Sequence, residues 1–399
     1  MTNSSWVNYA KRNVGIIIAG IALQLLLGNF NNTFLRYPIG AILAIAYVYS
    51  LYVIQTMSEQ KPWIRSLYDY KASITSMSFL LFLLILMGLL RQSNEHSLSV
   101  FPKLGINHMT SSWPFCLALF HFTSILGLQV MEELSHFSQR RIMPTLIHLC
   151  VFLIFAVSIF NCGDKEKVIV RTQLNEATHH GVSDGHKSTL PFSIKLKKFT
   201  LEEYPAKLYL IDEEGKLSKE TITMDHNQQV ATLDDWQIAI DKYIPQGLPD
   251  SLNTYQEIKH VGAVPIAFVR AKHNKTLVKT EGWVTCGSFI VPKRSLALDS
   301  SQELLMATPM AKRYCSEIEI EDLHSGEVTT HSVEVNHPAH IASWRIYQLG
   351  YDTELGSWSQ TSTLECVKDP GYFFIHIALW MILTLSILMF FNRTSKNKL

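Results

Sequence analysis

The sequence predicts a polytopic α-helical membrane protein that crosses the bilayer six times and carries a large β-rich extracytoplasmic domain before the last span. Three observations predict this fold: an uneven charge distribution, six long apolar stretches, and alternating hydrophobicity within the charged region. Only 17% of the 399 residues are charged, against roughly 25% in a typical soluble domain. Residues 163–370 hold 22 basic and 29 acidic side chains, whereas the remaining residues hold 13 and 5. This split excludes a single soluble globule, a disordered chain and a coiled coil.

Six apolar stretches are long enough to cross the hydrocarbon core of a bilayer, which takes about 20 helical residues. The first follows Lys11 and Arg12 as a signal peptide would, but it lacks a cleavage site, so we interpret it as a retained span. The stretches divide the chain into a five-span region (1–162), the β-rich domain (163–370), and a last span with its tail (371–399). The predicted spans are Val14–Phe30, Pro38–Gln55, Ile74–Leu90, Trp113–Met131, Ile142–Phe160 and Tyr372–Phe391.

Lysine and arginine in the short loops predict the orientation of the spans, because basic loops stay on the cytoplasmic side. With the N-terminus inside, ten basic residues lie in inner segments and three in outer ones. Both termini are then cytoplasmic, and the 163–370 domain is extracytoplasmic. The net charge of +1 gives no support to nucleic-acid binding, which needs concentrated basic charge. The inner residues are Lys11, Arg12, Lys61, Arg65, Lys71, Arg140, Arg141, Arg393, Lys396 and Lys398, and the outer ones are Arg36, Arg91 and Lys103.

Three histidines stand out in spans that are otherwise nearly free of charge: His121, His148 and His376. Each imidazole is either a neutral group bonded to a backbone carbonyl or a functional group, and imidazole is a common ligand of haem iron and other metals. His148 lies roughly 10 Å inside the cytoplasmic boundary at 1.5 Å per residue, whereas the other two lie nearer the outer face. One metal is therefore not easily shared by all three. A site at His148 needs a second ligand from elsewhere.

Alternating hydrophobic residues in the 163–370 region predict half-buried strands separated by turns. The length suffices for one β-rich domain with its own core, such as a sandwich or two packed sheets. We expect Asp225–Thr254 to be helical or irregular, with a short amphipathic helix over Leu233–Tyr243. The predicted strands are Ser193–Lys197, Ala206–Ile211, Ser316–Ile320 and Val333–Val335, and the predicted hairpin turns are Asp212–Gly215 and His324–Gly326.

The six cysteines divide between the two regions. Cys116 and Cys150 lie in spans, where a thiol behaves as a small apolar group. The other four lie outside, where an oxidising compartment permits disulfides, and we expect one structural bridge that involves Cys286, Cys315 or Cys366. The sequence has no CxxC, CxxCH, GxxxxGK[ST], HExxH or GxGxxG motif. The chain is therefore neither a thioredoxin-like reductase nor itself a c-type cytochrome, and it shows no nucleotide-hydrolysing or protease signature.

Three short motifs near the C-terminus resemble the signature of the ResB family of cytochrome c biogenesis proteins (system II, ResB/CcsB type). In that family VNxP, YQxGYD and DPG follow one another and lead into the last span. The His148-bearing span also resembles that of the family, and the likeness covers roughly residue 142 to the end. Order and spacing make the joint match fairly specific. The matching residues are Asn336 and Pro338, then Tyr347, Gln348 and Tyr351, then Asp369 and Pro370.

The resemblance implies a subunit of a cytochrome c synthase in a bacterial inner membrane, surrounded by lipid. Its partner is a CcsA-type membrane protein with a tryptophan-rich WWD segment. The pair moves haem outward and attaches it to the CxxCH thiols of apocytochrome c. By this resemblance His148 is an axial haem ligand, with His121 and His376 as further haem-binding candidates. No Trp cluster occurs here, so this subunit is expected to be non-catalytic, and the YQxGYD residues are expected to pack and hydrogen-bond in the β domain.

The chain departs from the family pattern in one respect. The family commonly places three spans before the outer domain, whereas five are predicted here, which preserves the sidedness of the domain. An alternative function is a membrane-anchored scaffold whose outer domain binds apocytochrome or a thioredoxin-like reductase without binding haem. A membrane enzyme acting through the outer domain is a more distant third, because no acid/base or nucleophile constellation stands out.

Overall fold

The structure, a computed structural model, describes residues 2–90, 92, 103–136, 142–224, 229–251 and 254–396. The chain divides into two compact units. Residues 1–165 and 368–399 form a helical unit, and residues 166–367 form a β unit. Of the basic residues used to predict the orientation, Arg91, Arg140, Arg141 and Lys398 lie outside the described residues.

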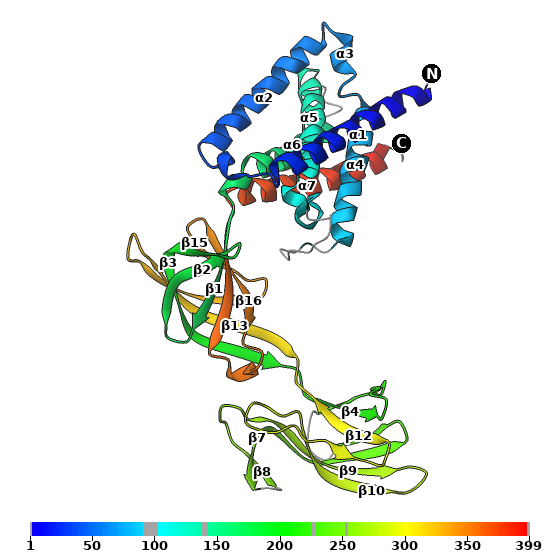
Figure 1. The fold of residues 1–399 in the computed structure, drawn as a ribbon, viewed down its shortest axis with the longest axis vertical. Coiled ribbons are helices and arrows are strands. Elements are labelled where there is room, and N and C mark those ends of the chain that lie inside the picture. Colours follow the sequence, from blue (N-terminus) through cyan, green and yellow to red (C-terminus); the bar gives the residue numbers. More distant parts are fainter. Residues whose placement is uncertain are drawn as a thin grey trace. The chain divides into compact units, whose positions relative to one another are not determined.

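In the described part of the chain, six helices are long and apolar enough to cross a membrane, as predicted. Helix α6 has the predicted bounds, whereas each of the others extends past its predicted stretch at one end, because adding residues to an existing helix is easier than nucleating one. At its other end α1 stops at Leu27, three residues before the predicted Phe30. Helix α1 ends where Gly28 adopts a left-handed φ of 73°, a common way of ending a helix. The helices are α1 (Thr2–Leu27), α2 (Ile39–Ser58), α4 (Tyr70–Leu89), α5 (Trp113–Ser135), α6 (Ile142–Phe160) and α7 (Tyr372–Lys396), with the short α3 (Pro62–Arg65) between α2 and α4 (Figure 1).

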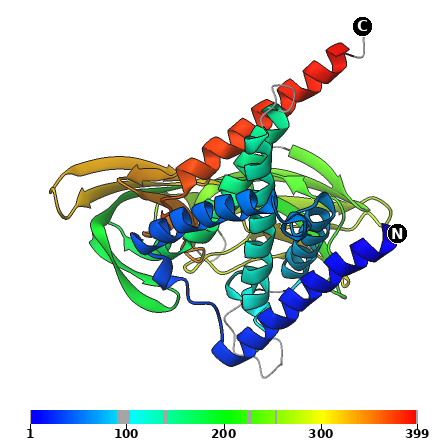
Figure 2. The same ribbon diagram turned by 90° about the horizontal axis from the view of Figure 1, so that it is seen from above.

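Helix α5 is the centre of the helical unit. It packs against α1, α2, α4 and α6, and α7 packs on α6 (Figure 2). Glycines allow the close approach: a Cβ at Gly20 would lie 2.5 Å from Cα of Pro114, and a Cβ at Gly127 would lie 2.6 Å from side-chain atoms of Leu51 and Phe152. Small residues at such crossings are the usual means of packing helices in a membrane. The packing of α5 against its neighbours determines which of its side chains face α6.

The β unit contains an eight-stranded sheet in the order β14-β13-β3-β2-β1-β17-β16-β15. The edge strands β14 and β15 also contact each other, so the sheet is nearly closed. Alternate residues such as Ile194, Leu196, Ile318 and Ile320 are fully buried in its interior. The strands are β1 (Glu166–Gln173), β2 (Ala177–Ser183), β3 (His186–Glu203), β13 (Ala311–Asp322), β14 (Val328–Glu334), β15 (Ala339–Ile341), β16 (Trp344–Tyr351) and β17 (Thr361–Lys368).

Two further sheets share a second core. Trp236 is buried in this core, and its Nε1 donates to Gln302 Oε1 at 2.7 Å, which joins β7 to β12. The five-stranded sheet contains β6 (Gln229–Leu233), β7 (Trp236–Ser251), β8 (Thr254–Glu257), β9 (Val264–His273) and β10 (Lys279–Thr285). The four-stranded sheet contains β4 (Lys207–Asp212), β5 (Ile222–Thr223), β11 (Leu296–Ala297) and β12 (Gln302–Ala307).

The helix predicted over Leu233–Tyr243 is wrong. Leu233 ends β6, and the following residues form β7, which pairs with β6 and β9. Trp236, Ile238 and Ile240 alternate on the buried face of β7, so a period of two was present in the sequence. A shift in register after Ile240 breaks this alternation, which explains why a window centred there reads as irregular or helical. Residues 225–228 and 252–253 of the predicted segment lie outside the described residues.

The other strand predictions are confirmed. The four predicted segments fall in β3, β4, β13 and β14, except that Ala206 precedes β4 and Val335 lies beyond the end of β14. The His324–Gly326 turn joins β13 to β14, and the Asp212–Gly215 turn leads from β4 to β5, which pairs with it. Both turns predicted from the sequence are therefore confirmed.

The six cysteines are free thiols in the structure, so the expected bridge among Cys286, Cys315 and Cys366 is not formed. Cys366 is fully buried inside the eight-stranded sheet. Cys315 lies on the outer side of β13, where its Sγ is 3.0 Å from Ser332 Oγ, because its neighbours Ser316 and Tyr314 alternate with it. Burial raises the pKa of Cys286 to about 11 and that of Cys366 to about 12. Alternation along β13 points Cys315 out of the eight-stranded sheet, and alternation along β17 points Cys366 into its interior. The two thiols therefore lie on opposite faces of the sheet.

Candidate functional site

His148 lies in the second turn of α6 and contacts a carboxylate on α5. Its Nδ1 is 2.9 Å from Oε1 and 3.1 Å from Oε2 of Glu133. The His148 side chain is 45% exposed and that of Glu133 is 31% exposed. The pair therefore lies at the surface of the helical unit rather than in its core.

The helical hairpin explains why these two residues meet. Helix α5 ends at Ser135 and α6 begins at Ile142, and two antiparallel helices joined by a short connection have their adjoining ends side by side. Glu133 is close to the end of α5, and His148 is close to the start of α6. We call this end of the helical unit, which also carries α3, the α3 end.

The contact with Glu133 determines which nitrogen of His148 is available. A carboxylate only accepts hydrogen bonds, so Nδ1 carries the proton and donates it. In a neutral imidazole Nε2 is then an unprotonated lone-pair donor suited to a metal. No described residue forms a hydrogen bond with Nε2 of His148. Among the residues that the structure describes, Nε2 of His148 is therefore left without a partner.

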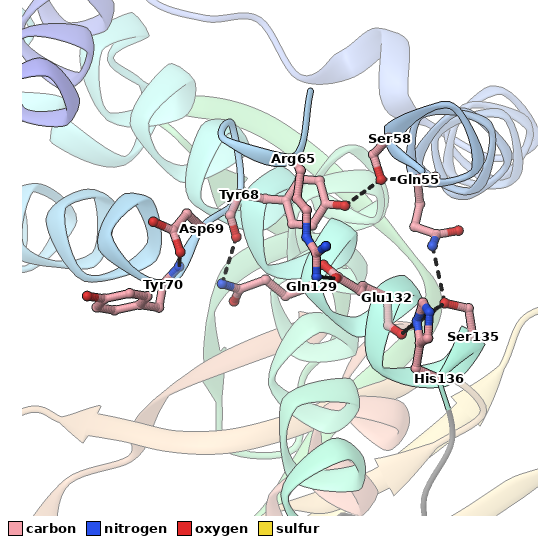
Figure 3. A network of polar contacts seen from close by, with 10 residues as sticks. All are labelled: Gln55, Ser58, Arg65, Tyr68, Asp69, Tyr70, Gln129, Glu132, Ser135 and His136. Atoms are coloured by element: carbon pink, nitrogen blue, oxygen red, sulfur yellow. Dashed lines mark hydrogen bonds and ion pairs between the residues drawn. The ribbon is translucent and has the colours of Figure 1, made fainter. Parts of the chain in front are cut away.

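The neighbouring Glu132 takes part in a different network (Figure 3). Arg65 of α3 donates from Nη2 to Glu132 Oε1 at 2.6 Å. Gln129, one turn earlier on α5, donates to the backbone oxygen of Tyr68 at 3.0 Å. Consecutive residues of a helix point about 100° apart, so Glu132 faces α3 whereas Glu133 faces α6.

A polar cavity of about 640 Å³ opens at the α3 end. Glu133 lines it, and so does Thr145, which lies three residues before His148 on α6. The cavity thus gives solvent access to the Glu133 carboxylate. Its remaining lining residues are Tyr9, Pro62, Arg65, Ser66, Tyr68, Asp69, Tyr70, Gln129, Glu132 and His136.

The other two histidine candidates do not share a site with His148. His121 lies twelve residues before Glu133 on α5, or roughly 18 Å along the helix axis. Its Nε2 is buried and has no partner among the described residues. His376 lies at the start of α7, where Nδ1 donates to the Tyr372 carbonyl at 3.1 Å and the two rings are in tilted contact, with centroids 3.6 Å apart. These are three separate positions, as the depth argument from the sequence predicts.

The described residues contain no group of three His, Cys, Asp or Glu side chains that could hold a metal ion. The donor set at His148 is therefore one imidazole with one carboxylate behind it. Such a set fits a haem iron, because the porphyrin supplies four ligands and the protein needs to supply only axial ones.

Two of the three motifs that resemble the family signature, VNxP and DPG, lie in turns and determine the local backbone conformation. Asn336 has a φ of 65° in the turn between β14 and β15, a conformation that Asn adopts more readily than most residues. Asp369 accepts a hydrogen bond from the Gly371 amide at 3.0 Å and pairs with Lys165 at 3.2 Å. A Cβ at Gly371 would lie 2.8 Å from Asn161 Nδ2. Pro338 and Pro370 stand directly before β15 and near the start of α7.

The third motif lies on β16 and contributes to the interior of the eight-stranded sheet. Gln348 is buried and donates from Nε2 to the Gly350 carbonyl and to Ser362 Oγ, both at 2.9 Å. Tyr351 packs against the rings of Phe199 and Tyr314, and burial raises its pKa. Tyr347 is half-buried. The contacts of Gln348 and Tyr351 are compatible with the packing and hydrogen-bonding roles expected from the resemblance, which stay a prediction.

Residues 272–377 match the ResB-like family. The matching stretch runs from the end of β9 to the first residues of α7 and contains all three motifs, so it confirms the resemblance and is consistent with ResB family membership. No curated protein matches the chain. Because the stretch includes neither His148 nor Glu133, a role for this pair depends on its own geometry. Glu133 was not among the site residues predicted from the sequence, although a carboxylate within one helical hairpin of an intramembrane histidine was a usable signal.

Proposed function

We propose that this chain, whose ResB-like match indicates a role in cytochrome c biogenesis, is the ResB-like subunit of a haem-transferring cytochrome c synthase. Together with a CcsA-type partner it takes part in moving haem across the membrane and attaching it to the CxxCH thiols of apocytochrome c. His148 is one axial ligand of the haem iron during transfer. The observation that carries this role is a membrane-helix imidazole whose Nδ1 is engaged by Glu133 and whose Nε2 has no hydrogen-bond partner among the described residues.

Burial and exposure at His148 support a site that is completed by another chain. The side chain is 45% exposed, so this chain alone does not enclose a ring bound there. The helical unit also leaves large apolar surfaces uncovered, which suit both lipid and the apolar porphyrin. The second axial ligand and the outer wall of the site are then contributed by the CcsA-type partner.

The direction of transfer follows from the predicted orientation. Lys61, Arg65 and Lys71 lie at the α3 end, and the positive-inside rule makes this end cytoplasmic. His148 and Glu133 lie at the same end, so the ligand is placed to receive haem from the cytoplasmic side. The β unit then faces the extracytoplasmic compartment, where apocytochrome c presents its thiols.

The test is a co-purification of the full chain with a CcsA-type protein from haem-replete bacterial membranes, followed by haem spectroscopy. In the His148→Ala variant we expect loss of the low-spin signature of the site, a lower haem content, and a lower yield of c-type cytochrome. Imidazole added to the growth medium should partly restore the haem content and the yield of c-type cytochrome, because it replaces the missing ligand.

The matched control is His136→Ala, which removes an exposed histidine at the same end of the unit that contacts Ser135 and the Glu132 backbone. It should retain the haem signature and the cytochrome yield. If His148→Ala co-purifies with normal haem and supports normal cytochrome maturation, the ligand role is refuted. A chain that binds the partner and apocytochrome but never carries haem would instead be a scaffold.

A further inference from the structure

We propose that Glu133 is the positioning residue of the His148 site: its carboxylate fixes the tautomer and the ring orientation of His148 and strengthens Nε2 as an iron ligand. This inference rests on the proposed function, because it concerns how the same imidazole is prepared for haem. No ligand role is assigned to Glu133 itself, which acts only through His148.

The geometry of the pair supports orientation rather than simple proximity. Both carboxylate oxygens lie within hydrogen-bond distance of one nitrogen, at 2.9 and 3.1 Å. A ring held in this way on one side has its opposite nitrogen, Nε2, directed away from α5. The two residues come from different helices, so the contact fixes the rotation of the His148 ring relative to the α5–α6 hairpin.

The chemistry of such a pair is well defined. Histidines that bind metals usually donate their second N–H to a carboxylate, a backbone carbonyl or water, which orients the ring and raises the basicity of the ligating nitrogen. Removing the outer partner typically weakens metal affinity by about 10- to 100-fold. A negative charge behind the imidazole also favours ferric over ferrous iron, so its loss should raise the reduction potential of a bound haem.

A purely structural role for the contact is the simplest alternative. Both side chains are partly exposed, and ion pairs between exposed groups usually contribute little to the stability of a fold. The α5–α6 interface already has apolar packing, including an edge-to-face contact between Phe122 and Phe155 and the contact of Gly127 with Phe152. The hairpin therefore does not depend on Glu133 to stay together, and a structural role predicts no change at the iron.

Glu132 provides a control on the same helix. It is the adjacent residue, it is also a partly exposed glutamate, and it forms an ion pair, but its partner is Arg65 on α3. The Glu132→Gln variant removes the same charge and a comparable salt bridge without touching His148. A comparison of Glu133→Gln with Glu132→Gln therefore separates an effect on the imidazole from a general effect of charge or stability.

The first measurement needs no haem. In the full chain labelled with ¹⁵N-histidine, the signals of His148 are those missing from the His148→Ala variant, among 16 histidines. We expect the Nδ1–H tautomer in the unaltered chain and in Glu132→Gln. Glu133→Ala should shift His148 toward the Nε2–H tautomer that neutral imidazole prefers in water. An unchanged tautomer in Glu133→Ala overturns the inference.

The second measurement is made on the complex with the CcsA-type partner. Glu133→Ala should raise the apparent haem dissociation constant by about 10- to 100-fold, and Glu133→Gln, which can still accept a hydrogen bond, should have a smaller effect. Both should raise the reduction potential, whereas Glu132→Gln should leave it close to that of the unaltered complex. Equal shifts in Glu133→Gln and Glu132→Gln would also overturn the inference.

The two proposals fail in different ways. If His148→Ala keeps its haem, the ligand proposal is wrong, whatever Glu133 does. If His148→Ala loses haem but both Glu133 variants match the unaltered chain in tautomer, affinity and potential, then His148 is a ligand and Glu133 does not position it.

Discussion

Gln348 tests whether the YQxGYD motif on β16 is structural. The side chain is only 7% exposed, and it makes two hydrogen bonds inside the eight-stranded sheet, to the Gly350 carbonyl and to Ser362 Oγ. Ser362 also accepts a bond from Ser316 on β13 at 2.8 Å, so Gln348 belongs to a buried network that links β16, β17 and β13. At about 1 kcal/mol for each bond, Gln348→Ala should destabilise this part of the sheet by about 2 kcal/mol.

Hydrogen–deuterium exchange on the full chain in detergent measures this loss where it occurs. Because 1.4 kcal/mol corresponds to a tenfold change in an equilibrium constant, amides of β16 and β17 should exchange about 30-fold faster in Gln348→Ala. The control is Gln173→Ala, which removes an exposed glutamine from β1 of the same sheet and should leave exchange unchanged. Unchanged protection in Gln348→Ala together with lost cytochrome maturation would refute the structural reasoning and assign the motif a direct functional role.

Two further predictions concern packing and thiol reactivity. Gly127→Leu should lower the melting temperature of the full chain in detergent, because overpacking costs about 1 to 3 kcal/mol and a Cβ here already meets Leu51 and Phe152 at 2.6 Å; Gly88→Leu, with nothing within 4 Å of its Cβ, should not. Burial raises the pKa of Cys366 to about 12, so at pH 8 its thiol stays protonated and should react with a maleimide only after unfolding. Labelling of Cys366 in the folded chain, detected by mass spectrometry, would contradict this placement.

The number of spans was predictable because a bilayer demands a property that a local window can measure. A run of apolar residues of sufficient length is recognisable whatever it contacts. The ends were harder to predict, since helices continue into polar residues: α5 extends past Met131 to Ser135. This added turn is the part of α5 that carries Glu132 and Glu133.

The strand β7 shows where local patterns fail. Its buried residues Trp236, Ile238 and Ile240 alternate, but the register with β9 shifts after Ile240, and the next buried residue of the strand is Ile244. A bulge inserts one extra residue into a strand, so that the residues after it point to the opposite face of the sheet from the one that the earlier alternation predicts. Because partner strands cause such a shift, the sequence of β7 by itself does not reveal it.

The candidate site was half predictable. His148 was identifiable as a titratable group in an apolar span, and its depth placed it near one end of the helical unit. The glutamate that contacts His148 was not identifiable from the sequence. Glu132 and Glu133 are adjacent, and only the rotation of α5 about its axis decides which of them faces α6. That rotation is set by packing around Leu51 and Phe152, through contacts between residues distant in the sequence.

The exposure of the His148 side chain favours a haem site to which a second chain contributes. In a bilayer, a polar atom without a hydrogen-bond partner is costly, so an intramembrane imidazole is expected to have both nitrogens engaged. Glu133 engages one, and 45% of the side chain remains uncovered. A partner that brings an iron to Nε2 would satisfy the second nitrogen and cover the ring at the same time. On this reasoning the isolated chain should hold haem weakly, and its affinity should rise when the partner supplies the opposite axial ligand.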